Sequence, residues 1–408
     1  MNEIAESYVK LALDVGEHDP DYVDAYYGPP QWRDEAKAAK TPLESIQGAA
    51  ERLLTSLRPI RVEDQEEILQ LRHRYLAKQL EAMVARIEML RGKRLTFDGE
   101  ARLLYDAAPP EYPEAHFQKL QGDLENLLPG RGPVTERYEA YRRAFTIPTE
   151  KLEAVFQTAI RECRGRTKEH IDLPANERFD IEYVQNKSWS GYNWYKGGSY
   201  SLIQINTDLP ISIDRAVDLA AHEGYPGHHV YNALLEKHFV RERHWVEFSI
   251  YPLHSPQSLI AEGTANYGIE LAFPGDERIA FEREHLFPLA GMDATETERY
   301  YTVHGLAVKL NYAHNEAARR YLNGEFDRAH AEDFLVAYAL MSPERARQRV
   351  RFIDTYRSYV INYNLGQDLV RNYIESRGGT PDRPGKRWEE FRLLISSPRL
   401  PSGLHLVP

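Results

Sequence analysis

The stretch HEGYPGHH at residues 222–229 decides how this chain is interpreted, because it places three imidazoles and one carboxylate within eight residues. In the common zinc-hydrolase helix H-E-x-x-H, two histidines one turn apart bind the metal, and the glutamate reaches the water beside it. Here Pro226 stands four residues after His222, and the next histidines follow six and seven residues after it. An unbroken helix therefore does not give either of them the usual one-turn geometry.

The pair Pro226 and Gly227 suggests how the extra residues are accommodated. Pro226 cannot donate a hydrogen bond to the carbonyl of His222, and glycine permits unusual dihedral angles, so we expect a kink between the histidines. A local π-type bulge could bring His228 to the place of the second metal ligand. We predict His228 as the ligand, with His229 as the alternative. The unused histidine would donate to substrate or orient a neighbour.

A third ligand is expected from a carboxylate, because a catalytic zinc site commonly combines three protein ligands with an open position for water. Glu262 is the candidate. It lies 40 residues after His222 in IAEGTANY, residues 260–267, a weakly charged helical stretch. Burying a carboxylate among small and apolar residues is costly without a positive partner, which a metal supplies. The alternative is an ordinary helix-surface or capping glutamate.

The composition narrows the class of protein. With 42% hydrophobic and 28% charged residues over 408 positions, and no apolar run long enough to cross a bilayer, the chain fits a soluble globular protein without a membrane partner. The net charge of -11 argues against a nucleic-acid partner. Because Cys163 is the single cysteine, zinc ligands must be nitrogen and oxygen atoms. Residues 1–15 lack the features of a secretory signal, so we expect a cytoplasmic location.

The hydrophobic pattern predicts a mainly α fold with a small β-sheet. Residues 1–171 read as a helical scaffold broken by proline and glycine. Alternation at residues 179–184 and 200–206 predicts strands at the active-site cleft, where an extended peptide could pair with them; an ordinary structural hairpin is the alternative. Helical patterns follow at residues 215–222, 230–239, 258–271, 296–322, 331–338, 343–363 and 365–375. We expect a scaffold (1–171), a catalytic region (172–377) and a wrapping tail (378–408) within one compact unit.

Three segments carry a resemblance to a known family. HEGYPGHH at 222–229 and AEGTANYGIEL at 261–271 resemble the paired motifs H-E-x-x-P-G-H-H and E-G-W-A-L-Y of the bacterial domain of unknown function 885 family, which is grouped with zincin-like metallopeptidases. YNLG at 363–366 resembles the late S-Y-x-I-G element of that family. Thr264 and Asn266 stand where the family has tryptophan and leucine, which bears on substrate preference and leaves the ligands intact.

The resemblance implies a large helical, gluzincin-like peptidase fold with a deep cleft. It implies zinc held by His222, a motif histidine and Glu262, with Glu223 as catalytic base. The chemistry of the residues agrees, since Glu223 would take a proton from the attacking water and deliver it to the leaving amine. When water attacks the carbonyl group, the carbonyl oxygen becomes negatively charged and needs a further hydrogen-bond donor. We choose Tyr363 for this role, with His304 and the unused motif histidine as alternatives.

Arg357 could bind a substrate carboxylate through two hydrogen bonds, which would favour free C-termini. We expect a salt bridge with Asp354 or another acid in preference to this substrate contact.

These observations predict a zinc-dependent metallopeptidase that hydrolyses peptide or small amide bonds, with Zn2+ as its cofactor. A catalytically inactive, zinc-bearing peptide-binding module is the main alternative, because the spacing of H-E-x-x-H is disrupted. A helical interaction protein with a structural histidine cluster is a third hypothesis.

Overall fold

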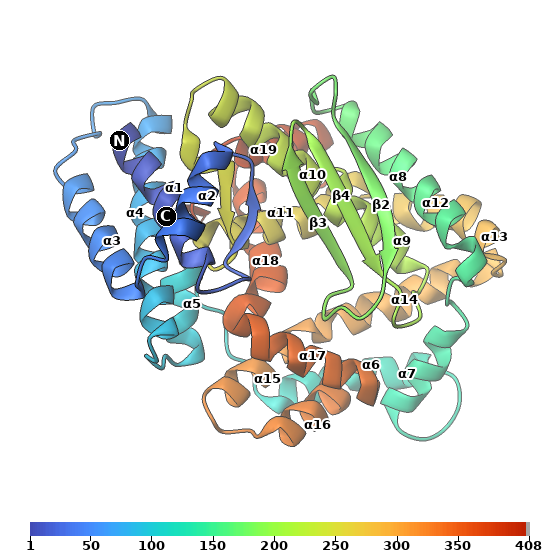
Figure 1. Cartoon of the computed structure of the whole chain (residues 1–408). Helices are drawn as coiled ribbons and strands as arrows, with labels where there is room; N and C mark the ends of the chain where they lie inside the picture. The colour runs from blue at the N-terminus through green and yellow to red at the C-terminus, as the bar shows by residue number, and fades with distance from the viewer. Residues whose placement is uncertain (405–408) are drawn as a thin grey trace.

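The helical patterns of the first half form a succession of helices, and the computed structural model describes residues 1–404 (Figure 1). Their bounds are α1 (Asn2–Gly16), α2 (Pro30–Ala39), α3 (Leu43–Leu57), α4 (Glu67–Leu90), α5 (Phe97–Tyr105), α6 (Glu114–Leu127), α7 (Val134–Arg143) and α8 (Leu152–Lys168). A short ribbon ties this half to the second, because β1 (Val23–Tyr26) pairs antiparallel with β5 (Ile250–Pro252). None of the helices in residues 1–404 has the length and apolar character needed to cross a membrane.

A three-stranded sheet lies where alternation predicted strands. Strands β2 (Arg178–Val184) and β4 (Tyr200–Asn206) match the expected segments, but they are parallel neighbours and not the two arms of a hairpin. The intervening β3 (Gly191–Gly197), which the sequence analysis did not predict, returns antiparallel on the other side of β4. Helix α10 (His228–Leu235) packs against β3 and β4, so the sheet is held against the segment that carries the histidine motif (Figure 1).

The second half is again helical, with several boundaries that differ from the predicted ones; the helix expected over residues 296–322, for example, is divided into two helices by a 3-10 turn at Lys309–Asn311. Its further helices are α9 (Asp214–Leu219), α11 (Pro256–Ala272), α12 (Asp276–Phe281), α13 (Phe287–Ala290), α14 (Thr297–Val308), α15 (Tyr312–Leu322), α16 (Arg328–Tyr338), α17 (Pro343–Tyr356), α18 (Ile361–Ser376) and α19 (Pro384–Ile395). The wrapping tail thus contains a helix, α19. The helix expected over residues 343–363 ends at Tyr356, because Arg357 adopts a positive φ of 53°.

The buried Glu100 of α5 accounts for that interruption. Its carboxylate accepts hydrogen bonds from the Arg357 Nε at 2.7 Å and from the Ser358 hydroxyl at 2.6 Å. The backbone N–H of Ser358 donates to the same carboxylate at 3.1 Å. Three donors on one buried acid fix the chain as it turns from α17 towards α18.

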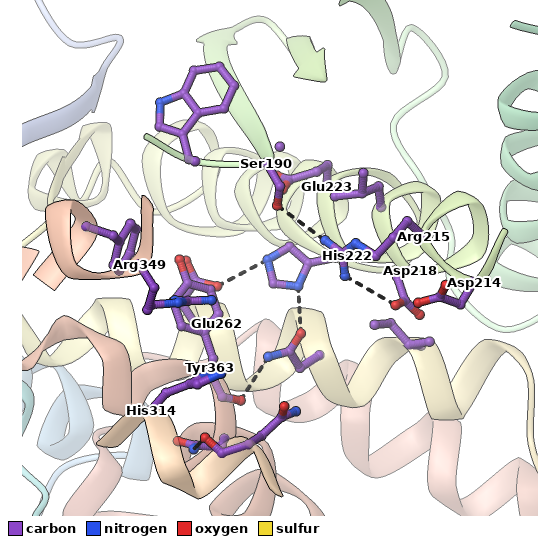
Figure 2. A pocket seen from close by; sticks show the side chains of 18 of the residues that line it. Ser190, Asp214, Arg215, Asp218, His222, Glu223, Glu262, His314, Arg349 and Tyr363 are labelled. Carbon is purple, nitrogen blue, oxygen red and sulfur yellow. Dashed lines mark hydrogen bonds and ion pairs between the residues drawn. The ribbon is translucent and has the colours of Figure 1, made fainter. Parts of the chain in front are cut away.

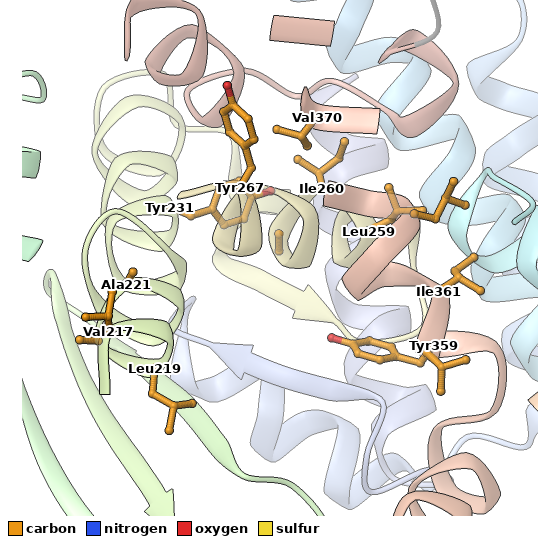
Figure 3. Packing of buried hydrophobic residues seen from close by; sticks show 14 of the residues in the cluster. Val217, Leu219, Ala221, Tyr231, Leu259, Ile260, Tyr267, Tyr359, Ile361 and Val370 are labelled. Carbon is orange, nitrogen blue, oxygen red and sulfur yellow. The ribbon is translucent and has the colours of Figure 1, made fainter. Parts of the chain in front are cut away.

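Helices α11 and α18 lie side by side and cross at a pair of glycines. A Cβ placed on Gly263 would lie 2.5 Å from the carbonyl carbon of Gly366, so the two backbones are in direct contact. Figure 3 shows buried Leu259 and Ile260 of α11 and Ile361 of α18 around this crossing. The mainly α fold with a small sheet that the sequence predicted is confirmed.

Replacing Gly263 by alanine should destabilise the protein, because the added methyl group meets backbone atoms that cannot move aside. Overpacking of this kind costs about 1–3 kcal/mol, more than the helix propensity that alanine gains. The measurement is the midpoint of unfolding in urea. The matched control is Gly165→Ala, an exposed helix position with open space around it, which should stabilise by about 0.5–1 kcal/mol. A Gly263→Ala variant as stable as the parent protein would contradict the proposed backbone contact.

Candidate functional site

The histidine motif forms a junction between two helices. Helix α9 widens into a π-turn at Ala220–Gly224, which contains His222 and Glu223. Tyr225 is then extended, the Tyr225–Pro226 bond is cis, and α10 begins at His228. The predicted position of the bulge, between the two histidines, is therefore wrong. The π-turn lies at the first histidine, and the chain leaves the helix before it reaches the second.

Gly227 allows the chain to fold back on the π-turn. A Cβ at this position would lie 1.9 Å from the carbonyl oxygen of His222, a distance that no side chain can occupy. The backbone N–H of Gly227 donates to the carbonyl of Ala221 at 2.9 Å. This close approach brings His228 back towards His222, which two extra residues on a continuous helix would not do.

Three predicted ligands converge at this junction. The Nε2 atoms of His222 and His228 lie 3.1 Å apart, and they lie 3.1 and 3.6 Å from Glu262 Oε2. These three atoms lie within 4.8 Å of one another, a separation that one ion could bridge. Glu262 Oε2 is buried and has no hydrogen-bond partner. A buried carboxylate oxygen rarely lacks a hydrogen-bond donor, so its position between the two imidazoles fits a bound cation.

Neighbouring side chains orient the ligands. Asn266 donates through Nδ2 to the carbonyl oxygen of Tyr363 at 2.8 Å, so its Oδ1 is free to accept from His222 Nδ1 at 2.9 Å (Figure 2). With its proton on Nδ1, a neutral His222 would offer its Nε2 lone pair to a cation at the cluster. The Tyr359 hydroxyl donates to Glu262 Oε1 at 2.7 Å. Burial raises the pKa of Glu262, but the imidazoles of His228 and His222 outweigh it and hold that pKa well below its usual range.

Glu223 lies between this cluster and the sheet. A Cβ at Gly191 of β3 would lie 2.9 Å from Glu223 Oε1, and the Asn193 side chain donates to the Glu223 carbonyl at 2.7 Å. Gly191 and Asn193 line the same cavity as the ligands, so the small sheet lies at the cleft as the sequence analysis expected. Burial raises the pKa of Glu223 above its ordinary value. The carboxyl group is therefore held next to the proposed ligands, and the imidazoles of His222 and His228 only partly offset the effect of burial on its pKa.

His229 points away from the cluster. Its Nδ1 lies 2.9 Å from the Ser201 hydroxyl of β4, and its Nε2 lies 3.1 Å from Glu177 Oε2. The side chain is fully buried between α10 and the sheet. Of the two adjacent histidines, His228 faces the candidate ligands and His229 joins the helix to the sheet.

Of the other predicted site residues, two line the cavity that contains the proposed ligands and one does not. Tyr363 lines the cavity, and its ring lies 6.4 Å from that of His222 at an angle of 26°. His304 also lines the cavity, with Nδ1 3.9 Å from the buried Asp214, and burial lowers its pKa. Arg357 does not line it, because its guanidinium binds Glu100. Arg357 thus forms the expected salt bridge with an acid, which is Glu100 and not Asp354, and the alternative substrate contact is not supported.

The cavity has a volume of about 680 Å³ and includes residues that the sequence analysis did not single out. Asn266 could have been found, since it lies one helical turn after Glu262 and on the same face. Tyr359 lies one turn before Tyr363 and could have been found in the same way. His314 and Arg349 lie on α15 and α17, away from every sequence motif, and only the fold brings them to the cavity.

Comparison with known proteins supports the fold. No protein-family model matches the chain, and no curated protein does. A solved structure of a candidate lipoprotein from Colwellia psychrerythraea is similar, with 14% identity and a TM-score of 0.52 over 91% of this chain and 70% of that one. A candidate lipoprotein of unknown function from Shewanella oneidensis has 13% identity and a TM-score of 0.51, covering 93% and 78%. An M32 carboxypeptidase from Deinococcus radiodurans R1 has 12% identity and a TM-score of 0.48, covering 98% and 90%. At these sequence identities the first two structures show a shared fold and nothing about function. The third structure, with a TM-score below 0.5, is too different to support a conclusion.

Replacing His229 by leucine should lower the free energy of unfolding by about 1–3 kcal/mol, because buried Ser201 and Glu177 would each lose a hydrogen-bond partner. Urea denaturation measures the change. The control His238→Leu removes a half-exposed histidine that pairs with Glu242, and it should shift stability by less than about 0.5 kcal/mol. Equal stability of the two variants would show that His229 is not a structural link.

Proposed function

We propose that this protein is a zinc-dependent metallopeptidase that hydrolyses peptide or small amide bonds. The observation that supports this proposal most is the convergence of His222, His228 and Glu262 on one point, with Glu262 Oε2 buried and without a hydrogen-bond partner. Two imidazoles and one carboxylate form a donor set found in catalytic zinc sites, where a fourth position stays open. The motif resemblance supports membership of the domain of unknown function 885 family as part of the same proposal.

Zinc bound at these three residues would supply a Lewis acid that activates water and polarises a carbonyl group. Asn266 and Tyr359 would hold His222 and Glu262 in position through the hydrogen bonds described above. Glu223 would accept the proton of the attacking water at its carboxylate and then deliver that proton to the leaving amine. Its burial beside β3 keeps bulk water away from this carboxyl group.

Tyr363 is the proposed donor to the oxygen that gains negative charge. Its side chain lines the cavity next to the ring of His222, and no other described residue hydrogen-bonds to its hydroxyl. The substrate would lie along β3, which is an edge strand in the order β2-β4-β3. Main-chain groups on such an edge can pair with an extended peptide. The proposed cytoplasmic location stays a prediction from the sequence.

Replacing Glu223 by glutamine should abolish hydrolysis and leave the zinc content unchanged, because glutamine keeps the shape of the side chain but cannot take up a proton. A general base contributes roughly 10²–10⁴-fold to the rate. The measurements are digestion of a peptide library and metal analysis of protein purified without a histidine tag. Glu242→Gln, an exposed acid, is the control. Undiminished turnover by Glu223→Gln would contradict the mechanism, and a wild-type protein that holds zinc and binds peptides without cleaving them would favour the inactive binding module.

Zinc affinity should respond differently to ligands and to the residues that orient them. His228→Ala should abolish stoichiometric zinc binding. Asn266→Ala should weaken it by about 10–100-fold, since it removes only the partner that orients His222. His229→Leu should leave the affinity unchanged in the folded protein. Competition with a chromophoric chelator measures all three, and unaltered zinc affinity in His228→Ala would contradict the proposed ligand set.

A further inference from the structure

Arg349 of α17 is a cation in the cavity that has no acid beside it. The side chain is partly buried and lines the cavity. Its guanidinium lies 5.3 Å from the centre of the Phe352 ring, a cation–π contact that uses none of its five N–H donors. Among residues 1–404 it makes no ion pair and no side-chain hydrogen bond. Burial lowers the pKa of Arg349, and the titratable groups that act on it are Tyr363 and Arg215, with no carboxylate among them.

The other arginines of the same cavity are all engaged. Their partners are the Ser212 hydroxyl for Arg142 at 2.6 Å, Asp218 for Arg215 at 3.2 Å and for Arg278 at 2.9 Å, and the Pro210 carbonyl for Arg345 at 2.9 Å. A guanidinium keeps its charge at neutral pH, and taking that charge out of water without a partner is costly. The open donors of Arg349 are therefore available to an anionic group of a ligand.

Arg349 is also close to the candidate reaction centre. Figure 2 shows it on the same side of the cavity as Glu262 and Tyr363, and Tyr363 is one of the two titratable groups that influence its pKa. His314 adjoins it, and burial followed by the charge of Arg349 holds the pKa of His314 well below its ordinary value. This imidazole is accordingly neutral and does not compete for an anion.

We propose that Arg349 binds the free α-carboxylate at the C-terminal end of a short peptide substrate, which makes the enzyme an exopeptidase that removes C-terminal residues. This inference rests on the proposed peptidase function. A planar guanidinium matches a carboxylate with two parallel hydrogen bonds. A cavity of about 680 Å³ has the size of a small-ligand site, so a bound peptide would be short and its terminus would lie inside. An acidic side chain offers the same carboxylate chemistry, and the experiment separates the two sources.

The test compares three ligands in zinc-loaded protein by calorimetry, using the Glu223→Gln background so that none is cleaved. The ligands are N-acetyl-alanyl-phenylalanine, its C-terminal amide, and N-acetyl-alanyl-glutamate with an α-carboxamide. We expect the free acid to bind about 10–100-fold more tightly than its amide, as for a hydrogen bond to a charged group. Arg349→Met should remove this preference, and Arg349→Lys should keep part of it. Arg347→Met is the matched control, because Arg347 is exposed on the same helix and pairs with Glu344.

Hydrolysis of the same three compounds by the wild-type protein distinguishes the two proposals. If none is cleaved, the peptidase function fails, and the calorimetry still tests Arg349 on its own. If the acid and its amide bind equally well, or if Arg349→Met retains the preference, the assignment of Arg349 is overturned. Preferential binding of the glutamyl amide over the free acid would also overturn it, because the recognised carboxylate would then belong to a side chain.

Discussion

Helices α11 and α18 touch backbone to backbone at Gly263 and Gly366, and the candidate site is arranged around this contact. Glu262 directly precedes the first glycine, and Tyr363 lies three residues before the second. With the helix axes this close, the Tyr359 hydroxyl reaches Glu262 and the Asn266 side chain reaches the carbonyl of Tyr363. A larger residue at either glycine would separate the helices and lengthen both hydrogen bonds. The glycines of the two family-like segments thus have a packing role that is distinct from chemistry.

The cost of burying charge determines how the ligands are held. Glu262 is buried, and a carboxylate in such a place needs positive charge or donors close by. Tyr359 satisfies one of its oxygens, and the two imidazoles face the other. Asn266 fixes the ring of His222 so that its Nε2 lone pair points inward. Two of the three ligands are thus oriented by Asn266 of α11 and by Tyr359 in the turn that leads into α18, before any ion or substrate arrives.

Part of this arrangement could be predicted from the sequence, because its signals are local. The donor types in residues 222–229, the acid at Glu262 and the alternation in β4 each depend on a few consecutive residues. What could not be predicted depends on partners far away in the chain. The break at Arg357 is set by Glu100, 257 residues earlier. Strand β3 has glycine at both ends and no clear alternation, so only its pairing with β4 reveals it. Arg349 is recognised as a candidate anion-binding residue only in the folded structure, where no carboxylate pairs with it.

The two adjacent histidines of the motif, His228 and His229, have different roles. Successive residues on a helix point about 100° apart, so His228 and His229 at the start of α10 cannot face the same neighbour. His228 turns to Glu262 on α11, whereas His229 turns to Ser201 on β4 and to Glu177 before β2. One histidine therefore completes the candidate metal centre, and the other fixes the sheet relative to it. Since β3 is paired to β4, the position of its free edge beside Glu223 depends on this second histidine. A substitution at His229 would consequently disturb the cleft through the sheet, even with every proposed ligand in place.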